Sequence, residues 1–310
     1  MELHTCLASD VSAFDFKRSD LVRLEEDLPG VNLRFHETTA GFLAAGTAAE
    51  YVLTWEFDAA WYARFLHLKK IFTPAAGRDW VAADPRGSVE VIHGTFHGRL
   101  LGESLLGAML FMNRRMPDMI RNFERRKWDR NIQQDCRLLA NQTVLILGLG
   151  RIGGECARLL LALGARVVGI KRDPSSPPPG LAGVDVRSAS ELDATLPEAD
   201  HVAVLLPAGA GTDRILDETR LRKCRPGAYI YNFGRGNAVA SDDLARAADH
   251  IGGAFLDVTD REPLDSSSPL WSLNNIMITP HSSCIYREYK EAFVEEVIAH
   301  LGRRPVRHKA

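Results

Sequence analysis

The chain has 310 residues, 45% of them hydrophobic and 25% charged, and its formal net charge is −2 at pH 7. This mixture is typical of a globular protein, and the length predicts two domains with ample buried cores. A net charge so close to zero excludes a general electrostatic attraction to nucleic acid or to an anionic membrane, so we expect neither as a partner.

The five cysteines are odd in number and far apart, and no two form a CxxC pair. This pattern argues against a disulfide framework and against a zinc knuckle, and no other cluster has the spacing of a metal site. The chain does not open with the basic segment and apolar run of a secretory signal, and no apolar run is long enough to cross a membrane. We therefore expect a cytoplasmic protein without a bound metal.

The first hundred residues alternate short apolar runs with helical patterns. Strands are predicted at 51–54 and 69–73, with a helix at 61–68 between them. Such alternation favours a parallel sheet with crossover helices. Residues 104–123 then give a long helical pattern that Pro117 interrupts, and the residues that follow are polar and irregular.

From Thr143 onward the pattern becomes regular. A helix at 152–163 and further helical patterns separate fully apolar runs, which predict strands at 143–147, 166–170, 201–206, 228–232, 254–258 and 276–279. Continuous apolar runs indicate strands buried on both faces, and hence a doubly wound α/β sheet. A proline-rich loop at 174–180 lies within this region, and the chain ends with an amphipathic helix at 286–301 and a basic tail.

The segment TVLILGLGRIG matches GxGxxG and lies where that motif requires, after an apolar strand and at the start of a helix. Gly148 permits the tight turn, Gly150 lets the backbone approach a pyrophosphate, and Gly153 permits close packing of helix on strand. The amides of Arg151 and Ile152 then face the phosphate. The alternative is a glycine-rich turn that binds no ligand.

The residues at the end of the next strand favour one dinucleotide over the other. NAD sites commonly place an acid about 20 residues after the glycines, where it accepts the ribose hydroxyls. Here Lys171 and Arg172 occupy that place, and Asp173 follows them. Two cations suit the 2′-phosphate of NADP(H), which we favour. The alternative is that Asp173 binds the ribose and Lys171 is merely solvated, so that NAD(H) is used.

Three further segments each follow the carboxyl end of a predicted strand, the edge at which open α/β sheets bind ligands. They are NFGRG with Arg235, LDVTDREPL with Asp257 and Glu262, and TPHS with His281. An arginine is suited to bind a carboxylate, and a histidine next to a carboxylate is suited to move a proton. The sequence therefore predicts a reaction site at this edge.

In this order and at these spacings, the glycine loop and the three segments resemble the D-isomer-specific 2-hydroxyacid dehydrogenases, which include glyoxylate/hydroxypyruvate reductases and D-3-phosphoglycerate dehydrogenases. The resemblance is good from about residue 100 and looser before it, where AAGRD at 75–79 looks like the family's substrate loop. It implies a Rossmann-type cofactor domain at 104–283, inserted into a smaller flavodoxin-like substrate domain made of 1–103 and 284–310.

The resemblance also implies roles for single residues. Arg235 would hold the substrate carboxylate through its guanidinium fork, and His281 would donate the proton to the carbonyl oxygen as hydride arrives. Glu262 would orient His281 and stabilise its protonated form. For each of the three, the alternative is an ordinary exposed side chain on a loop.

Further expectations concern Asp257, Leu206, Pro207 and Phe233, which lie at or near the same edge. Asp257 would contact the nicotinamide carboxamide, or it is an ordinary strand-end cap. Leu206 and Pro207, at the end of the strand 201–206, are expected among the cofactor contacts. Phe233 precedes the Gly-Arg-Gly turn with a bulky ring that could narrow the site.

In the substrate loop, Ala76, Gly77 and Arg78 are expected to bind the substrate, with backbone amides directed at its carboxylate. Arg78 stands where the family usually has an apolar residue. It therefore either faces solvent or binds a second anionic group on the substrate, and the sequence leaves both alternatives open.

We therefore expect an NADP(H)-dependent reductase that converts small 2-oxo acids to D-2-hydroxy acids, and the resemblance implies a homodimer. A second hypothesis is a dinucleotide-sensing protein of the same fold, which binds the dinucleotide but does not turn over a substrate. The corepressors that resemble this family are proteins of this kind. A third keeps hydride transfer but uses an unusual donor such as formate or phosphite.

Overall fold

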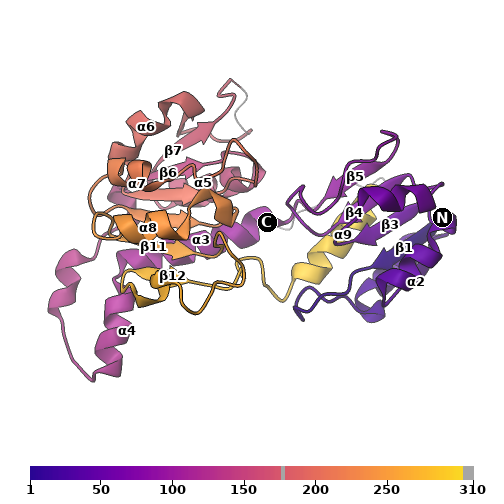
Figure 1. Cartoon of the computed structure of the whole chain (residues 1–310), viewed down its shortest axis with the longest axis horizontal. Coiled ribbons are helices and arrows are strands. Elements are labelled where there is room, and N and C mark those ends of the chain that lie inside the picture. Colours follow the sequence, from indigo (N-terminus) through magenta and orange to yellow (C-terminus); the bar gives the residue numbers. More distant parts are fainter. Residues whose placement is uncertain (176–178, 303–310) are drawn as a thin grey trace. The chain divides into compact units, whose positions relative to one another are not determined.

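The computed structural model describes residues 1–175 and 179–302. Residues 176–178 of the predicted proline-rich loop and 303–310 of the predicted basic tail lie outside the described residues. The chain forms two compact units, each with its own sheet (Figure 1). Unit 1 joins Met1–His97 to the chain from Ile285 onward, and unit 2 is the intervening segment Gly98–Cys284.

Unit 1 is built on a parallel sheet in the order β2-β1-β3-β4-β5. The strands are β1 (Glu2–Cys6), β2 (Asn32–Phe35), β3 (Tyr51–Thr54), β4 (Lys70–Thr73) and β5 (Glu90–His93), and the α-helices are α1 (Val22–Asp27), α2 (Thr39–Ala44) and α9 (Tyr289–Leu301). Val52 and Ile71 pack with Phe42 of α2, whereas Phe72 of β4 contacts His300 of α9. The last helix of the chain therefore packs on a sheet formed by its first hundred residues.

Unit 2 contains a parallel sheet in the order β12-β11-β10-β9-β6-β7-β8. The strands are β6 (Thr143–Leu147), β7 (Arg166–Lys171), β8 (Val184–Ser188), β9 (His201–Val204), β10 (Tyr229–Asn232), β11 (Gly253–Leu256) and β12 (Ile276–Ile278). One face carries α3 (His97–Asn113) and α5 (Arg151–Ala162), and the other carries α6 (Leu192–Thr195), α7 (Glu218–Lys223) and α8 (Ser241–Ala247).

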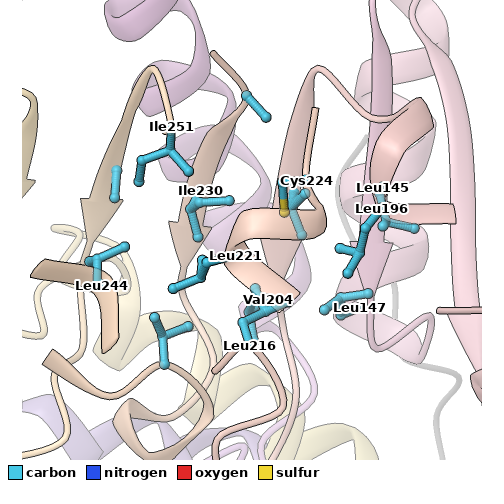
Figure 2. Close-up of a cluster of buried hydrophobic side chains, with 14 of the residues drawn as sticks. Leu145, Leu147, Leu196, Val204, Leu216, Leu221, Cys224, Ile230, Leu244 and Ile251 are labelled. Atoms are coloured by element: carbon cyan, nitrogen blue, oxygen red, sulfur yellow. The ribbon is translucent and has the colours of Figure 1, made fainter. Parts of the chain in front are cut away.

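The side chains of β6 show how both layers are filled. Val144 and Ile146 pack in the cluster formed with α3 and α5, whereas Leu145 and Leu147 pack on the opposite face, because successive side chains of a strand point to opposite sides. Figure 2 shows this second cluster, to which α7 contributes Leu221. Burial on both faces explains the continuous apolar runs, and the predicted α/β class is confirmed.

The strand order of unit 2 reverses between β6 and β9. The chain runs from β6 through β7 to β8, then crosses to β9 and continues through β10 and β11 to β12. In an open parallel sheet, the loops that leave two such strands run in opposite directions, and the ligand crevice lies at their carboxyl ends. The loops after β6 and β9 are therefore the expected place for a ligand.

Some predicted elements differ from the structure. The segment 61–68 is not an α-helix, and a 3-10 helix at Ala59–Arg64 lies there instead. The break in the long helical pattern lies before Pro117, which occupies the first turn of α4 (Met116–Glu124), a position that proline tolerates well. Arg115 separates α3 from α4 because its backbone is left-handed, with φ of 55°.

Helix α4 and the chain that follows it extend from unit 2 (Figure 1). We call residues 116–138 the arm. Its exposed apolar side chains include Ile120, Phe123, Trp128 and Leu138, and Trp128 is 91% exposed. Large apolar side chains that stay exposed to solvent within one segment are candidates for an interaction site. In the described ranges of the chain, no helix combines the length and the apolar character needed to span a bilayer.

Candidate active site

The carboxyl edge of the unit 2 sheet carries most of the residues singled out in the sequence. They follow β6, β7, β9, β10, β11 and β12. Because all strands are parallel, the loops after them leave the sheet at this same edge. The contacts between these loops decide how the site is held.

Gly148 and Gly153 shape the turn between β6 and α5. Gly148 has φ of +104°, and a Cβ there would lie 2.8 Å from the carbonyl oxygen of Leu205. A Cβ on Gly153 would overlap the carbonyl oxygen of Gly148. At Gly150, by contrast, a Cβ would meet no described atom within 4 Å. Packing therefore requires glycine at 148 and at 153, whereas the space beside Gly150 is open.

Helix α5 begins at that open space, with Gly150 as its N-cap and no side chain capping it. The amides of its first residues, including Arg151 and Ile152, have no acceptor within the helix, because helix geometry leaves the first turn unpaired. Such amides, at the positive end of the helix dipole, favour an anion. The residues present therefore fit a pyrophosphate.

Two cations stand at the end of β7. Lys171 is its last residue, and Arg172 follows at an exposed position. The carboxylate of Asp173 accepts hydrogen bonds from the hydroxyl of Ser175 at 2.6 Å and from its amide at 3.0 Å. These bonds, and to a smaller extent the charge of Lys171, hold the pKa of Asp173 below its usual value. Asp173 is thus engaged within its own loop.

Arg235 lies in the turn after β10. The amide of Gly234 donates to Asn232 Oδ1 at 3.2 Å, and Asn232 Nδ2 donates to the carbonyl of Arg235 at 3.1 Å. A Cβ on Gly234 would approach the backbone of Leu206 to 2.5 Å, and Leu206 also lies beside Gly148. Leu206, which follows β9, therefore lies between the glycine turn and the arginine turn.

The arginine turn packs on the loop that carries Glu262. A Cβ on Gly236 would overlap the carbonyl oxygen of Thr259. The Thr259 amide donates to Glu262 Oε1 at 3.1 Å, and the amide of Ser241 donates to Asp260 Oδ2 at 3.0 Å. The close approach at Gly236 therefore places the loops after β10 and β11 against each other.

Asp257 fixes the turn that holds His281. Its carboxylate, 2% exposed, accepts the Thr279 hydroxyl at 2.7 Å and the amides of Ser282 and Ser283 at 2.8 and 3.0 Å. The amide of His281, whose φ is 50°, donates to the carbonyl of Asp257 at 2.8 Å. These contacts match the strand-end cap alternative, and a contact with the nicotinamide carboxamide stays a prediction.

His281 and Glu262 are brought together by the fold. His281 Nδ1 lies 3.0 Å from Glu262 Oε2, and the two side chains are 46% and 40% exposed. With Nδ1 donating to the carboxylate, Nε2 is the nitrogen directed at a further partner. A histidine held at one ring nitrogen by a carboxylate can move a proton through its other ring nitrogen.

Arg235 and Cys284 lie at the same edge, where the charge of Arg235 affects the pKa of the Cys284 thiol. Arg235 Nη1 donates to the carbonyl of Gly234 at 3.1 Å. Burial raises the pKa of the Cys284 thiol to about 12, the charge of Asp257 raises it too, and Arg235 lowers it. The charge of Arg235 therefore acts on the segment just after His281, and the raised pKa of Cys284 disfavours the nucleophilic thiolate form.

Some sequence expectations concern residues outside this edge. Phe233 is 6% exposed and stacks on Phe255 with ring centroids 5.8 Å apart, so it belongs to the core and not to the wall of the site. Ala76, Gly77 and Arg78 lie in unit 1, in the loop after β4, where Arg78 is exposed. Among the described residues, no group of three or more His, Cys, Asp or Glu is placed to hold a metal ion.

The sequence does not single out Gly236, Thr259 or Asp260, which hold the loops together. Their roles depend on contacts between segments, which a linear pattern does not show. The one local signal is the glycine directly after Arg235, because a glycine in a turn commonly marks a close backbone approach.

Comparison with known proteins identifies the family to which the sequence and fold are similar. Residues 106–283 match the family model described as D-isomer specific 2-hydroxyacid dehydrogenase, NAD binding domain. Glyoxylate/hydroxypyruvate reductase A of Citrobacter koseri is 30% identical over 293 residues, covering 90% of this chain and 90% of that protein. The chain spans less of two other curated relatives, 47% and 40% of their lengths.

Two solved structures extend the likeness to both units. A D-isomer specific 2-hydroxyacid dehydrogenase from Xanthobacter autotrophicus, in complex with NADPH and MES, is 27% identical with a TM-score of 0.82, and the match covers 99% of this chain and 97% of that one. A probable 2-hydroxyacid dehydrogenase from Rhizobium etli, in complex with NADP, HEPES and L(+)-tartaric acid, is 26% identical with a TM-score of 0.79, covering 99% and 96%. The chain belongs to the D-isomer specific 2-hydroxyacid dehydrogenase family.

Proposed function

We propose that the chain is an NADP(H)-dependent reductase that converts small 2-oxo acids to D-2-hydroxy acids. The observation that carries the proposal is the contact of His281 Nδ1 with Glu262 Oε2 at 3.0 Å, in a loop that packs on the turn of Arg235. A general acid beside a carboxylate-binding guanidinium is what the reduction of a 2-oxo acid requires.

Three side chains of unit 2 would act on the substrate. Arg235 would bind its carboxylate with two N–H groups and so orient the neighbouring carbonyl. His281, held at Nδ1 by Glu262, would give its Nε2 proton to the carbonyl oxygen. Glu262 would stabilise the protonated imidazole before the transfer. That Ala76, Gly77 and Arg78 of unit 1 bind the substrate stays a prediction from the sequence.

The bound cofactor supplies the hydride, and the chain's residues fit it at two places. The open space at Gly150 accommodates the pyrophosphate, to which the amides of Arg151 and Ile152 would donate. Lys171 and Arg172 would hold the 2′-phosphate. The two similar solved structures contain NADPH and NADP, which supports this choice over NAD(H). The proposed cofactor contacts further include Gly148, Gly153, Leu206, Pro207 and Asp257.

Gly150→Ala tests the phosphate site. We expect the variant to unfold at the wild-type temperature, because a Cβ meets no described atom within 4 Å and φ is −93°. We expect NADPH to bind about 10-fold more weakly or worse, because the methyl group would crowd the pyrophosphate. Gly107→Ala is the matched control, since this glycine of α3 also has open space around it. Unchanged NADPH affinity in Gly150→Ala would contradict the phosphate site.

The double variant Lys171→Ala with Arg172→Ala tests the preference for NADP(H). Each charge-assisted hydrogen bond contributes roughly 1.5–3 kcal/mol, so we expect kcat/KM for NADPH to fall about 100-fold while that for NADH changes little. Arg166→Ala, at the opposite end of the same strand, is the control. A wild-type protein that prefers NADH, or a double variant that keeps its preference, would remove these cations from cofactor selection.

The proposed activity is tested with a panel of 2-oxo acids, glyoxylate and hydroxypyruvate among them, and with NADPH as the reductant. Turnover that gives the D-2-hydroxy acid supports the proposal. Tight NADPH binding without turnover on any 2-oxo acid favours the dinucleotide-sensing alternative. Oxidation of formate or phosphite with NADP favours the unusual-donor alternative.

We also propose a homodimer that forms through the arm. The support is the exposure of its large apolar side chains, which include Phe123 at 84% and Trp128 at 91%. Burial of such rings against a second copy is favourable in proportion to the apolar area removed from water.

The five cysteines are free, which suits the proposed cytoplasmic location.

A further inference from the structure

The loop after β9, residues 205–216, begins against one side of the arginine turn. A Cβ on Gly234 of that turn would lie 2.5 Å from the carbonyl oxygen of Leu206 and 2.7 Å from its amide nitrogen. The Thr212 hydroxyl donates to the carbonyl of Pro207 at 2.8 Å, so the loop closes on itself beyond this contact. Because Leu206 and Pro207 are proposed cofactor contacts, the position of this loop matters for the cofactor as well as for the arginine turn.

The same loop ends against the other side of the arginine turn. The amide of Arg214 donates to the carbonyl of Asn237 at 2.7 Å, and the amide of Leu216 donates to the carbonyl of Ala238 at 3.1 Å. Asn237 and Ala238 follow Arg235 in the chain, whereas the first contact of the loop precedes it. The backbone that carries Arg235 therefore runs between two contacts with one loop.

The side chain of Arg214 fixes the end of this loop to α8. Its Nε donates to Asp243 Oδ2 at 2.9 Å, and its Nη2 donates to Oδ1 at 2.9 Å and to Oδ2 at 2.7 Å. Asp243 belongs to α8 and is 1% exposed, so its carboxylate depends on charged partners in place of water. The φ of Arg214 is 47°, a strained conformation for an arginine that persists where the surrounding contacts hold it. A guanidinium fork on a buried carboxylate supplies such a hold, because it sets both distance and direction.

Helix α8 is in turn attached to the loop that carries Glu262. The Ser241 amide donates to Asp260 Oδ2 at 3.0 Å, and the Ser241 hydroxyl donates to Asp260 Oδ1. Arg246, one helical turn after Asp243, donates to the same buried carboxylate from within α8. The helix therefore joins the loop after β9 to the loop after β11, and Arg214 makes the first of these two attachments.

We propose that Arg214 is a positioning residue, whose pair with Asp243 holds the loop after β9 and the arginine turn in one arrangement. This inference rests on the proposed function, in which the start of that loop contacts the cofactor and Arg235 binds the substrate carboxylate. Arg214 acts through the loop that it fixes. Hydride transfer requires the donor and the acceptor carbon at a set distance, so a shift of this loop against the turn lowers the rate.

The test replaces two arginines that share the Asp243 carboxylate. Arg214→Asn removes the fork and keeps a residue that tolerates the left-handed backbone. Arg246→Asn is the matched control, because it takes a cation from the same carboxylate, while its other partner is Glu218 of α7 at 2.7 Å. We expect both variants to lower the urea midpoint of unfolding, since each leaves a buried charge less well paired.

The two variants should differ in function. For the best 2-oxo acid of the panel, we expect Arg214→Asn to lower kcat/KM about 10- to 100-fold, the loss that a displacement of about 1 Å at a reaction site brings. NADPH should bind to it about 5-fold more weakly by fluorescence titration, the size expected for one lost hydrogen bond. Arg246→Asn should leave both quantities within about 2-fold of the wild type, as distant substitutions do.

Two further variants examine the pair itself. Asp243→Asn should reproduce the kinetic loss of Arg214→Asn, and the double variant should lose no more than either single variant, because the two residues act as one unit. Arg214→Lys should show a smaller loss, since it keeps the buried charge paired and removes the fork. It also provides the comparison with Arg246→Asn in a protein whose buried carboxylate is still neutralised.

The outcomes separate this inference from the proposed function. Turnover of 2-oxo acids with equal kinetics in Arg214→Asn and Arg246→Asn overturns the positioning role and leaves the proposed function standing. Additive losses in the double variant overturn it as well. If the wild type turns over no 2-oxo acid, the proposed function fails and the NADPH titrations decide the role of Arg214. Weaker binding in Arg214→Asn than in Arg246→Asn then supports it, and equal binding overturns it.

Discussion

His281→Ala is expected to lower kcat by about 10²- to 10⁴-fold, the range that positioned proton transfer contributes. The physical reason is that Nε2 of His281 is the proposed proton donor, and Glu262 holds its Nδ1 at 3.0 Å. NADPH affinity should stay near that of the wild type, because the proposed phosphate contacts lie after β6 and β7. Steady-state kinetics and NADPH titration by fluorescence measure the two quantities separately.

The backbone at His281 has φ of 50°, so a folding defect has to be separated from a catalytic one. His281→Asn serves this purpose, since asparagine tolerates the left-handed region and cannot act as the acid. Glu262→Gln should cost less, because the amide still accepts a hydrogen bond but no longer stabilises the protonated ring. Turnover near the wild-type level in both His281 variants would remove this residue from the mechanism.

Acid is expected to destabilise the folded chain through His201, which has no exposed surface. Its ring nitrogens lie 3.0 Å from the Tyr231 hydroxyl and 3.0 Å from Gln142 Oε1. Burial lowers the pKa of His201 from 6.5 to about 4. The charge of Asp200 raises this pKa by a smaller amount, and the charge of Arg137 lowers it slightly further. The folded state therefore binds this proton less readily than the unfolded chain does.

The sign and window of the effect follow from the two pKa values. The contribution of His201 is fully present above pH 6.5 and is lost as pH falls toward 4, up to about 3 kcal/mol of unfolding free energy. Between pH 7 and pH 5 the wild type should lose about 2 kcal/mol more than His201→Gln, measured by urea denaturation. The exposed His67→Gln is the control. Equal losses in wild type and His201→Gln would show that the folded and unfolded states bind this proton equally, and so that the pKa of His201 is not lowered by folding.

Most of the unit 2 sheet could be predicted from the sequence because its central strands are buried on both faces. Runs such as 143–147 contain no polar residue that weakens the signal after Thr143, and the glycine motif marks the turn that follows. The strand ends could be located in the same way, so Arg235, Glu262 and His281 were assigned to one edge. The approach of His281 to Glu262 required the fold, because it joins loops of two different strands.

Unit 1 was less predictable for physical reasons. Strands β2 and β5 lie at the edges of its sheet and keep partly exposed side chains, so they lack a continuous apolar run. The segment after β3 has apolar residues at helical spacing but forms a 3-10 helix at Ala59–Arg64, where Asp58 caps its start. Short edge elements take their form from tertiary contacts more than from local propensity.

The position of Arg78 shows what a sequence pattern leaves open. The pattern identifies the loop and shows that a cation replaces an apolar residue. The structure adds that the base of this loop is fixed, because the amide of Gly94 donates to the carbonyls of Thr73 at 2.9 Å and Ala75 at 3.1 Å.

The close approach of Gly236 to Thr259 has a consequence for how this protein can be altered. Because two loops share one van der Waals boundary there, a change that shifts the arginine turn also shifts the glutamate loop, and with it the partner of His281. Laboratory evolution toward new substrates should therefore accumulate few mutations at this junction. It should instead accept them in the loop at 74–80, whose tip can vary while its base stays anchored.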